Sequence, residues 1–162
     1  QDQNEGRPVH EWPLTELHEL EGYNQNYRTV GQFMSTDLFT VRPDDVVDYV
    51  ASIMHWEHIR YVPVENEEGR LVGLVSQRHL LPLLAQGSSL NRAQGVPVHM
   101  IMKKDPVTVT PDTPTIEAIE MMRQRHLGCL PVIEQGRLVG VVTLFDLLAV
   151  SAKLLEEELK KK

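Results

Sequence analysis

The feature that most constrains this chain is an internal repeat. Compared with itself, the 162-residue sequence matches at an offset of 68 residues, which falls to 67 after a one-residue insertion near Asn66. A repeat of this kind indicates two copies of one structural unit. The matching residues of the first part are Met34, Asp37, Thr40, Val41, Pro43, Asp44, Met54, His58, Pro63 and Val64, which recur as Met102, Asp105, Thr108, Val109, Pro111, Asp112, Met122, His126, Pro131 and Val132. In the second part, residues 69–73 and Val75 recur as residues 136–140 and Val142.

Each copy carries the same succession of expected elements. A Thr-Val pair before a proline predicts a short strand, and the following Pro-Asp pair is typical of a turn and a helix start. Apolar residues at helical spacing come next, and then two short apolar runs separated by a glycine turn, which predict a hairpin. A second helix is expected over residues 77–85 in one copy and from residue 144 in the other. The unit is therefore β-α-β-β-α, and the fold class is α+β.

The repeat also divides the chain into regions. We expect a partly helical N-terminal arm over residues 1–29, repeat 1 over 30–85, a polar linker over 86–97, repeat 2 over 98–150 and a helical tail over 151–162. One unit of this size buries too little surface to be stable alone, so the two copies are expected to pack sheet to sheet. The polar first residues, which begin with Gln1, are typical of a piece of a longer protein.

The net charge and the composition restrict the classes of partner that we expect for this chain. A formal net charge of -7 and a sequence pI near 5.5 provide no general attraction to nucleic acid. No apolar run approaches the roughly 20 residues that span a bilayer, and no signal-peptide pattern opens the chain. A single cysteine, Cys129, is typical of a reducing compartment. We therefore expect a cytoplasmic protein with neither nucleic acid nor membrane as a partner.

The order of elements, the paired segments of glycine, two hydrophobic residues and Ser or Thr, and the aspartate that closes the second segment resemble tandem cystathionine-β-synthase (CBS) domains, or Bateman modules. The resemblance covers residues 30 to 148 approximately. It implies two repeats packed about a pseudo-two-fold axis, with a regulatory adenosyl ligand (AMP, ADP, ATP or S-adenosylmethionine) in the clefts between them. It also implies a homodimer and an effector domain attached covalently to the module.

The segment over residues 140–146 is similar to the ribose-binding signature of that family. Asp146 can accept hydrogen bonds from both ribose hydroxyls, with the Thr143 hydroxyl beside it. The alternative is that Thr143 only caps the following helix and Asp146 only complements its positive end. Copy one has Ser76 and His79 at these places, and a histidine cannot replace a carboxylate with two acceptors. We expect the first cleft to bind nucleotide weakly, not at all, or to select another ligand.

The resemblance places other groups around the same ligand. It implies that His58 and Arg60 approach the phosphate. It implies that the adenine contacts the backbone and side chains of Thr108, Val109, Cys129, Leu130 and Pro131. The alternative is that these apolar residues are simply core, since apolar strand residues are buried with or without a ligand. A solvated helix end is the simpler interpretation of Arg123, Arg125 and His126.

No catalytic or metal site emerges from the sequence. His55 and His58 have a spacing that can hold a metal on one helix face, but no third ligand is evident. Cys129 lies in an apolar strand, where thiols are usually inert, and there is neither a nucleophile elbow nor a phosphate loop. We expect no enzyme and no catalytic cofactor. Two hypotheses stay open: a ligand-sensing regulatory module, and a structural dimerisation scaffold with vestigial clefts.

Overall fold

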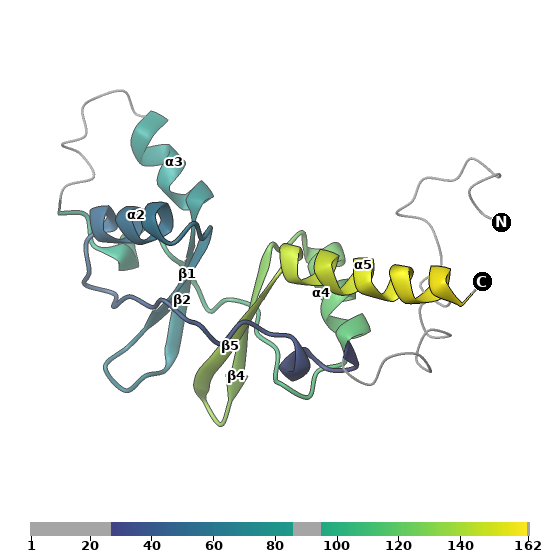
Figure 1. The fold of residues 1–162 in the computed structure, drawn as a ribbon. Helices are drawn as coiled ribbons and strands as arrows, with labels where there is room; N and C mark the ends of the chain where they lie inside the picture. The colour runs from purple at the N-terminus through teal and green to yellow at the C-terminus, as the bar shows by residue number, and fades with distance from the viewer. Residues whose placement is uncertain (1–26, 86–94, 162) are drawn as a thin grey trace.

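The computed structural model describes residues 27–85 and 95–161, and it confirms the predicted α+β fold of two repeats (Figure 1). Most of the predicted N-terminal arm and most of the predicted linker lie outside the described residues. Repeat 1 consists of α2 (Val47–Trp56), β1 (Tyr61–Glu65), β2 (Leu71–Ser76) and α3 (Gln77–Ala85). Repeat 2 consists of α4 (Thr115–Arg125), β4 (Cys129–Glu134), β5 (Arg137–Thr143) and α5 (Leu144–Lys160).

The two predicted hairpins form in matching register, and they lie next to each other in the middle of the molecule (Figure 1). Tyr61 pairs with Ser76 in repeat 1, and Cys129 pairs with Thr143 in repeat 2. Both hairpins turn through a glycine with positive φ, 75° at Gly69 and 78° at Gly136. Glycine adopts this conformation without a steric penalty, which explains why the turn recurs in both copies.

The expected first strand of each unit is reduced to a single bridge. Val41 pairs in parallel with Val64, and Val109 with Val132. The first helices also begin later than the Pro-Asp pairs, at Val47 in α2 and at Thr115 in α4. The Pro-Asp turns have another role, because their carbonyls accept hydrogen bonds from a different part of the chain.

The segment that precedes each repeat crosses to the other repeat. Val30 N and Gly31 N donate to Thr113 O and Pro111 O at 2.9 and 2.8 Å, and Ser35 forms a two-way backbone bridge with Val141. This first crossing segment contains the 3-10 helix η5 (Val30–Gln32).

The second crossing segment does the same for repeat 1. It contains the 3-10 helix η7 (Val98–Met100) and β3 (Lys103–Lys104), and β3 joins repeat 1 in the sheet order β1-β2-β3. Val98 N and His99 N donate to Asp45 O and Pro43 O at 2.8 and 2.9 Å.

The hydrophobic core of each repeat therefore contains one residue of the segment that crosses to it from the other repeat. Val30 belongs to the repeat 2 core, and Val98 belongs to the repeat 1 core, both fully buried. Each crossing segment packs closely on a glycine of the other repeat. A Cβ built at Gly140 would lie 2.9 Å from the Cγ of Met34, and a Cβ built at Gly73 would lie 2.9 Å from the Cγ of Met102. Neither repeat has a complete core by itself, so the two copies are expected to fold as one unit.

The last helix, α5, runs without interruption into the predicted C-terminal tail. Within the two described ranges, no helix combines the length and the apolar character needed to cross a membrane.

Candidate functional site

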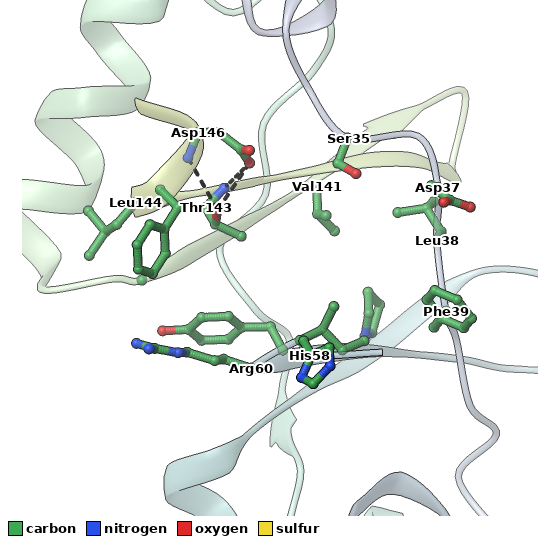
Figure 2. A pocket seen from close by; sticks show the side chains of 15 residues that line it. Ser35, Asp37, Leu38, Phe39, His58, Arg60, Val141, Thr143, Leu144 and Asp146 are labelled. Carbon is green, nitrogen blue, oxygen red and sulfur yellow. Dashed lines mark hydrogen bonds between the residues drawn. The ribbon is translucent and has the colours of Figure 1, made fainter. Parts of the chain in front are cut away.

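A cavity of about 460 Å³ lies between the two repeats (Figure 2). The first crossing segment provides part of its wall, the connection from α2 into β1 provides another part, and the junction of β5 with α5 provides the third. The residues that line it are Ser35, residues 37–39, residues 58–61, Pro63, Gly128, Val141 and residues 143–146. Of the nine site residues that the sequence predicts, this cavity brings together Thr143, Asp146, His58 and Arg60.

Thr143 and Asp146 form a reciprocal cap at the start of α5. The Oδ2 atom of Asp146 accepts from the Thr143 backbone N–H at 2.8 Å and from its hydroxyl at 3.1 Å, and Asp146 N donates back to Oγ1 at 3.4 Å. These bonds are drawn in Figure 2. Thr143 therefore caps α5, and its reciprocal bonds with Asp146 form a capping box. The second carboxylate oxygen, Oδ1, has no bond to another described residue and remains an acceptor in the cavity wall.

Arg60 reaches from repeat 1 to repeat 2. Its Cζ atom lies 5.3 Å from the centroid of the Phe145 ring, a cation–π contact across the cavity wall. Both residues line the cavity, and both are exposed to solvent, so the contact lies at the rim. His58, also at the wall, has a left-handed conformation (φ 55°), as does its counterpart His126 (φ 53°).

Tyr61 and Gly128 make the closest approach between the repeats at this site. A Cβ added at Gly128 would overlap the Tyr61 hydroxyl and lie 2.8 Å from its Cζ atom. Burial of the tyrosine raises the pKa of its hydroxyl. Glycine is required at position 128 because the tyrosine ring occupies the space of any side chain there.

The five residues predicted at the adenine do not line this cavity. Val109, Cys129, Leu130 and Pro131 are buried core residues, and Thr108 is half-buried beside them. Burial, and secondarily the Asp146 carboxylate, raise the pKa of the Cys129 thiol to about 12, so it stays protonated near neutral pH. A role for these residues at an adenine stays a prediction.

Other apolar residues provide the cavity wall, and the sequence interpretation missed them. Leu38 and Phe39 come from the crossing segment, and Leu144 and Phe145 come from the start of α5. A signal was present, since Leu38 and Phe39 follow the recurring Asp37 directly. The periodicity could not reveal that this stretch faces the opposite repeat.

The equivalent junction of repeat 1 has a different electrostatic character. The Ser76 backbone N–H donates to Nδ1 of His79 at 3.0 Å, so an imidazole takes the place of the carboxylate cap. Burial, and then the positive charges of Lys103 and Arg78, lower the pKa of His79. This junction therefore presents a neutral imidazole beside two cations and has no Asp146 equivalent.

Within residues 27–85 and 95–161, no group of three or more His, Cys, Asp or Glu side chains gathers in a way that could hold a metal ion. The ring of His55 lies edge-on to Trp56 at 5.1 Å between centroids.

Known proteins resemble both the sequence and the fold. The family model described as the CBS domain matches residues 30–86 and 98–153. A CBS domain-containing protein of Dictyostelium discoideum is 36% identical over 135 residues, which cover 78% of this chain and 93% of the relative. The A-adding tRNA nucleotidyltransferase of Aquifex aeolicus is 32% identical over 82% of this chain, yet the match covers only 15% of that enzyme.

Solved structures show the same architecture. A CBS-domain containing protein from Agrobacterium tumefaciens superposes with a TM-score of 0.71 at 25% identity, covering 80% of this chain and 98% of that protein. CBSX2, solved in complex with AMP, superposes with a TM-score of 0.70 at 26% identity, covering 79% and 98%. A structure of CBSX2 from Arabidopsis thaliana superposes with a TM-score of 0.69 at 24% identity, covering 80% of this chain and 97% of that protein.

Proposed function

Because the chain belongs to the CBS domain family, we propose that it is a regulatory module that binds an adenine nucleotide or another adenosyl ligand between its two repeats. The observation that carries the proposal is the position of Asp146. Its carboxylate lies in the wall of a cavity of about 460 Å³, and one of its oxygens accepts no hydrogen bond from the described residues. The volume is within the range of cavities that hold drug-sized ligands.

The ribose is assigned to the β5–α5 junction. The Oδ1 atom of Asp146 accepts from a ribose hydroxyl, while Oδ2 stays bonded to Thr143 and fixes the carboxylate. A carboxylate has capacity for more than one bond on each oxygen, so a second ribose hydroxyl can share the group. The cap and the ligand contact are therefore compatible functions of one side chain.

The remaining walls suit the other parts of such a ligand. Leu38, Phe39 and Val141 provide apolar surface for an adenine ring, and Arg60 with His58 provides donors for a phosphate. S-adenosylmethionine shares the adenosine part and is the alternative ligand. The AMP bound to CBSX2 supports the adenosyl assignment, because the two chains are similar over most of their lengths.

A regulatory role is supported by the fact that both repeats contribute to the wall of the cavity. Its walls come from both repeats, so a bound ligand favours the relative orientation in which both walls contact it. We propose that the module itself performs no chemistry and acts in the cytoplasm on an effector, either attached to the same polypeptide or separate. The Aquifex nucleotidyltransferase, in which the matching region is a small part of the enzyme, supports the attached arrangement.

A structural dimerisation scaffold is the second candidate. Exposed apolar side chains on α2 and α5 favour self-association, with Trp56 75% exposed and Leu159 72% exposed. We propose a homodimer in either case. A monomeric sedimentation profile at high protein concentration would contradict the dimer.

The test of ligand binding is isothermal titration with AMP, ADP, ATP and S-adenosylmethionine. We expect one binding event per chain, abolished by Asp146→Ala and unaffected by His79→Ala, the matched change in repeat 1. A circular dichroism spectrum of each variant controls for folding. An absence of heat with every ligand would refute ligand sensing and leave the scaffold.

A further inference from the structure

The contact between Arg60 and Phe145 has a consequence for ligand choice. We infer that Phe145 positions the Arg60 guanidinium at the cavity rim, so that the site selects adenosine ligands with a 5′-phosphate over adenosyl thioethers and sulfonium compounds. The inference rests on the proposed function of the same cavity. It adds a positioning residue and a ligand class to it.

The cation–π contact leaves the guanidinium able to bind an anion. With Cζ 5.3 Å from the ring centroid, the charge lies over the Phe145 ring. A guanidinium carries five N–H donors, so one aromatic neighbour cannot occupy all of them. No salt bridge joins Arg60 to a carboxylate of the described residues. The donors are therefore available to a phosphate.

Stacking also reduces the cost of binding. A long, exposed arginine loses rotamer freedom when it binds a ligand, and a side chain already held in place loses less. Phe145 is 64% exposed, so its ring contributes little to the core and is free to act as a platform. Arg60 is accordingly preorganised by a residue of the opposite repeat.

The position of the charge favours phosphate over a cationic substituent. Arg60 lies at the end of the cavity that contains Thr143 and Asp146, whereas Asp37 lies at the other end (Figure 2). A 5′ substituent leaves a ribose held by Asp146 close to this guanidinium. A phosphate is attracted there, and a sulfonium is repelled.

The pairing is specific to this cleft. By the repeat alignment, Arg60 corresponds to Gly128 and Phe145 corresponds to Arg78. A glycine and an arginine cannot form this cation–π contact. The positioning of an arginine by an aromatic ring is thus a property of the cavity with Asp146 and not of its counterpart.

The test compares AMP with adenosine, which differ only in the phosphate, by titration of the full chain. Phe145→Leu should lower AMP affinity about threefold to fivefold and leave adenosine affinity unchanged, since an exposed cation–π contact contributes about 0.5–1 kcal/mol. Phe145→Tyr, which keeps the ring, should behave like wild type. Leu148→Ala is the matched control, because Leu148 is a similarly exposed side chain (63%) of the same helix outside the cavity.

A double-mutant cycle isolates the positioning role. In an Arg60→Gln background, Phe145→Leu should have no further effect on AMP, because no guanidinium is left to position, and Arg60→Gln alone should remove at least as much of the phosphate-dependent, salt-sensitive affinity as Phe145→Leu does. Equal losses for AMP and adenosine in Phe145→Leu would overturn the inference while leaving adenosyl binding intact. Failure of the wild type to bind either compound would instead refute the proposed function itself.

Discussion

The β2–α3 and β5–α5 junctions have the same helix cap, in which a backbone N–H donates to the side chain three residues later, but the two capping side chains differ. In repeat 1, Nδ1 of His79 accepts from the Ser76 N–H at 3.0 Å, and in repeat 2, Oδ2 of Asp146 accepts from the Thr143 N–H at 2.8 Å. The imidazole has one acceptor nitrogen, and the cap occupies it. The carboxylate has a second oxygen left over. Equivalent positions thus give the same support to the fold and different chemistry to the two clefts.

A second pair of positions differs in size. Arg60 and Tyr61 of repeat 1 correspond to Gly128 and Cys129 of repeat 2. The tyrosine ring of repeat 1 lies on the glycine of repeat 2, so a large side chain meets an empty position. The contact between repeats is therefore asymmetric although their backbones match, and the asymmetry leaves Arg60 able to reach Phe145.

The largest expected effect is on AMP affinity, when the Asp146 cap of repeat 2 is changed to match the His79 cap of repeat 1. Asp146→His should lower AMP affinity about 100-fold or more, because two hydrogen bonds to a charged acceptor contribute about 1.5–3 kcal/mol each. The histidine can still accept from the Thr143 N–H, as His79 does from Ser76. Stability should change little, and titration together with thermal unfolding separates the two effects.

The reverse exchange is the control for that comparison. His79→Asp provides repeat 1 with the missing carboxylate while the adjacent Lys103 and Arg78 remain. AMP affinity of the Asp146 cavity should be unchanged in this variant. Unaltered AMP binding in Asp146→His would contradict the assignment of the ribose to Asp146.

The next effect is on stability at the Tyr61–Gly128 contact. Gly128→Ala should destabilise the fold by about 1–3 kcal/mol, the usual cost of an added group in a close-packed site. Urea denaturation measures it. Tyr61→Cys, which copies the residue of repeat 2, should remove most of that cost in the double variant. Additive free energies would show that the tyrosine ring is not what excludes a side chain at position 128.

Much of the fold was predictable because the sequence contains two copies of the same structural unit. The recurrence of residues 69–73 and 136–140 predicted both hairpins, and apolar periodicity predicted the helices. The crossing of residues 30–35 and 97–104 was not predictable. A repeat indicates that two segments have equivalent environments. It does not indicate whether each segment packs on its own copy or on the other copy.

The same ambiguity limited prediction of the site. Thr143 and Asp146 were identifiable because cap chemistry is local in sequence. Leu38 and Phe39 reach the cavity only through the crossing, so the recurring Asp37 beside them could not show which repeat they face. Val109 and Leu130 illustrate the opposite case, since an apolar strand residue has the same pattern whether it faces a ligand or the core.

The smallest effect is a pH dependence confined to the repeat 1 cap. Burial, Lys103 and Arg78 lower the pKa of His79 in the folded state, so the native protein favours the neutral imidazole. The unfolded chain then takes up the proton first as the pH falls through about 6.5. Stability from this group is fully present above that pH and is lost as the pH falls toward the lowered pKa.

His79→Gln tests this, because an amide oxygen can accept from the Ser76 N–H without titrating. The unfolding free energy of both proteins is measured by urea denaturation from about pH 7.5 to about pH 5.5, where the contributions of all other groups cancel in the difference. Wild-type stability relative to His79→Gln should decrease on acidification. The corresponding pair Asp146→Asn and wild type should show no such trend over this range, since His79 is present in both proteins and its contribution cancels in the difference. A difference for His79 that stays constant or grows as the pH falls would mean that neither burial nor the two cations lowers the pKa of the imidazole, and the electrostatic contrast between the clefts would then rest on Asp146 alone.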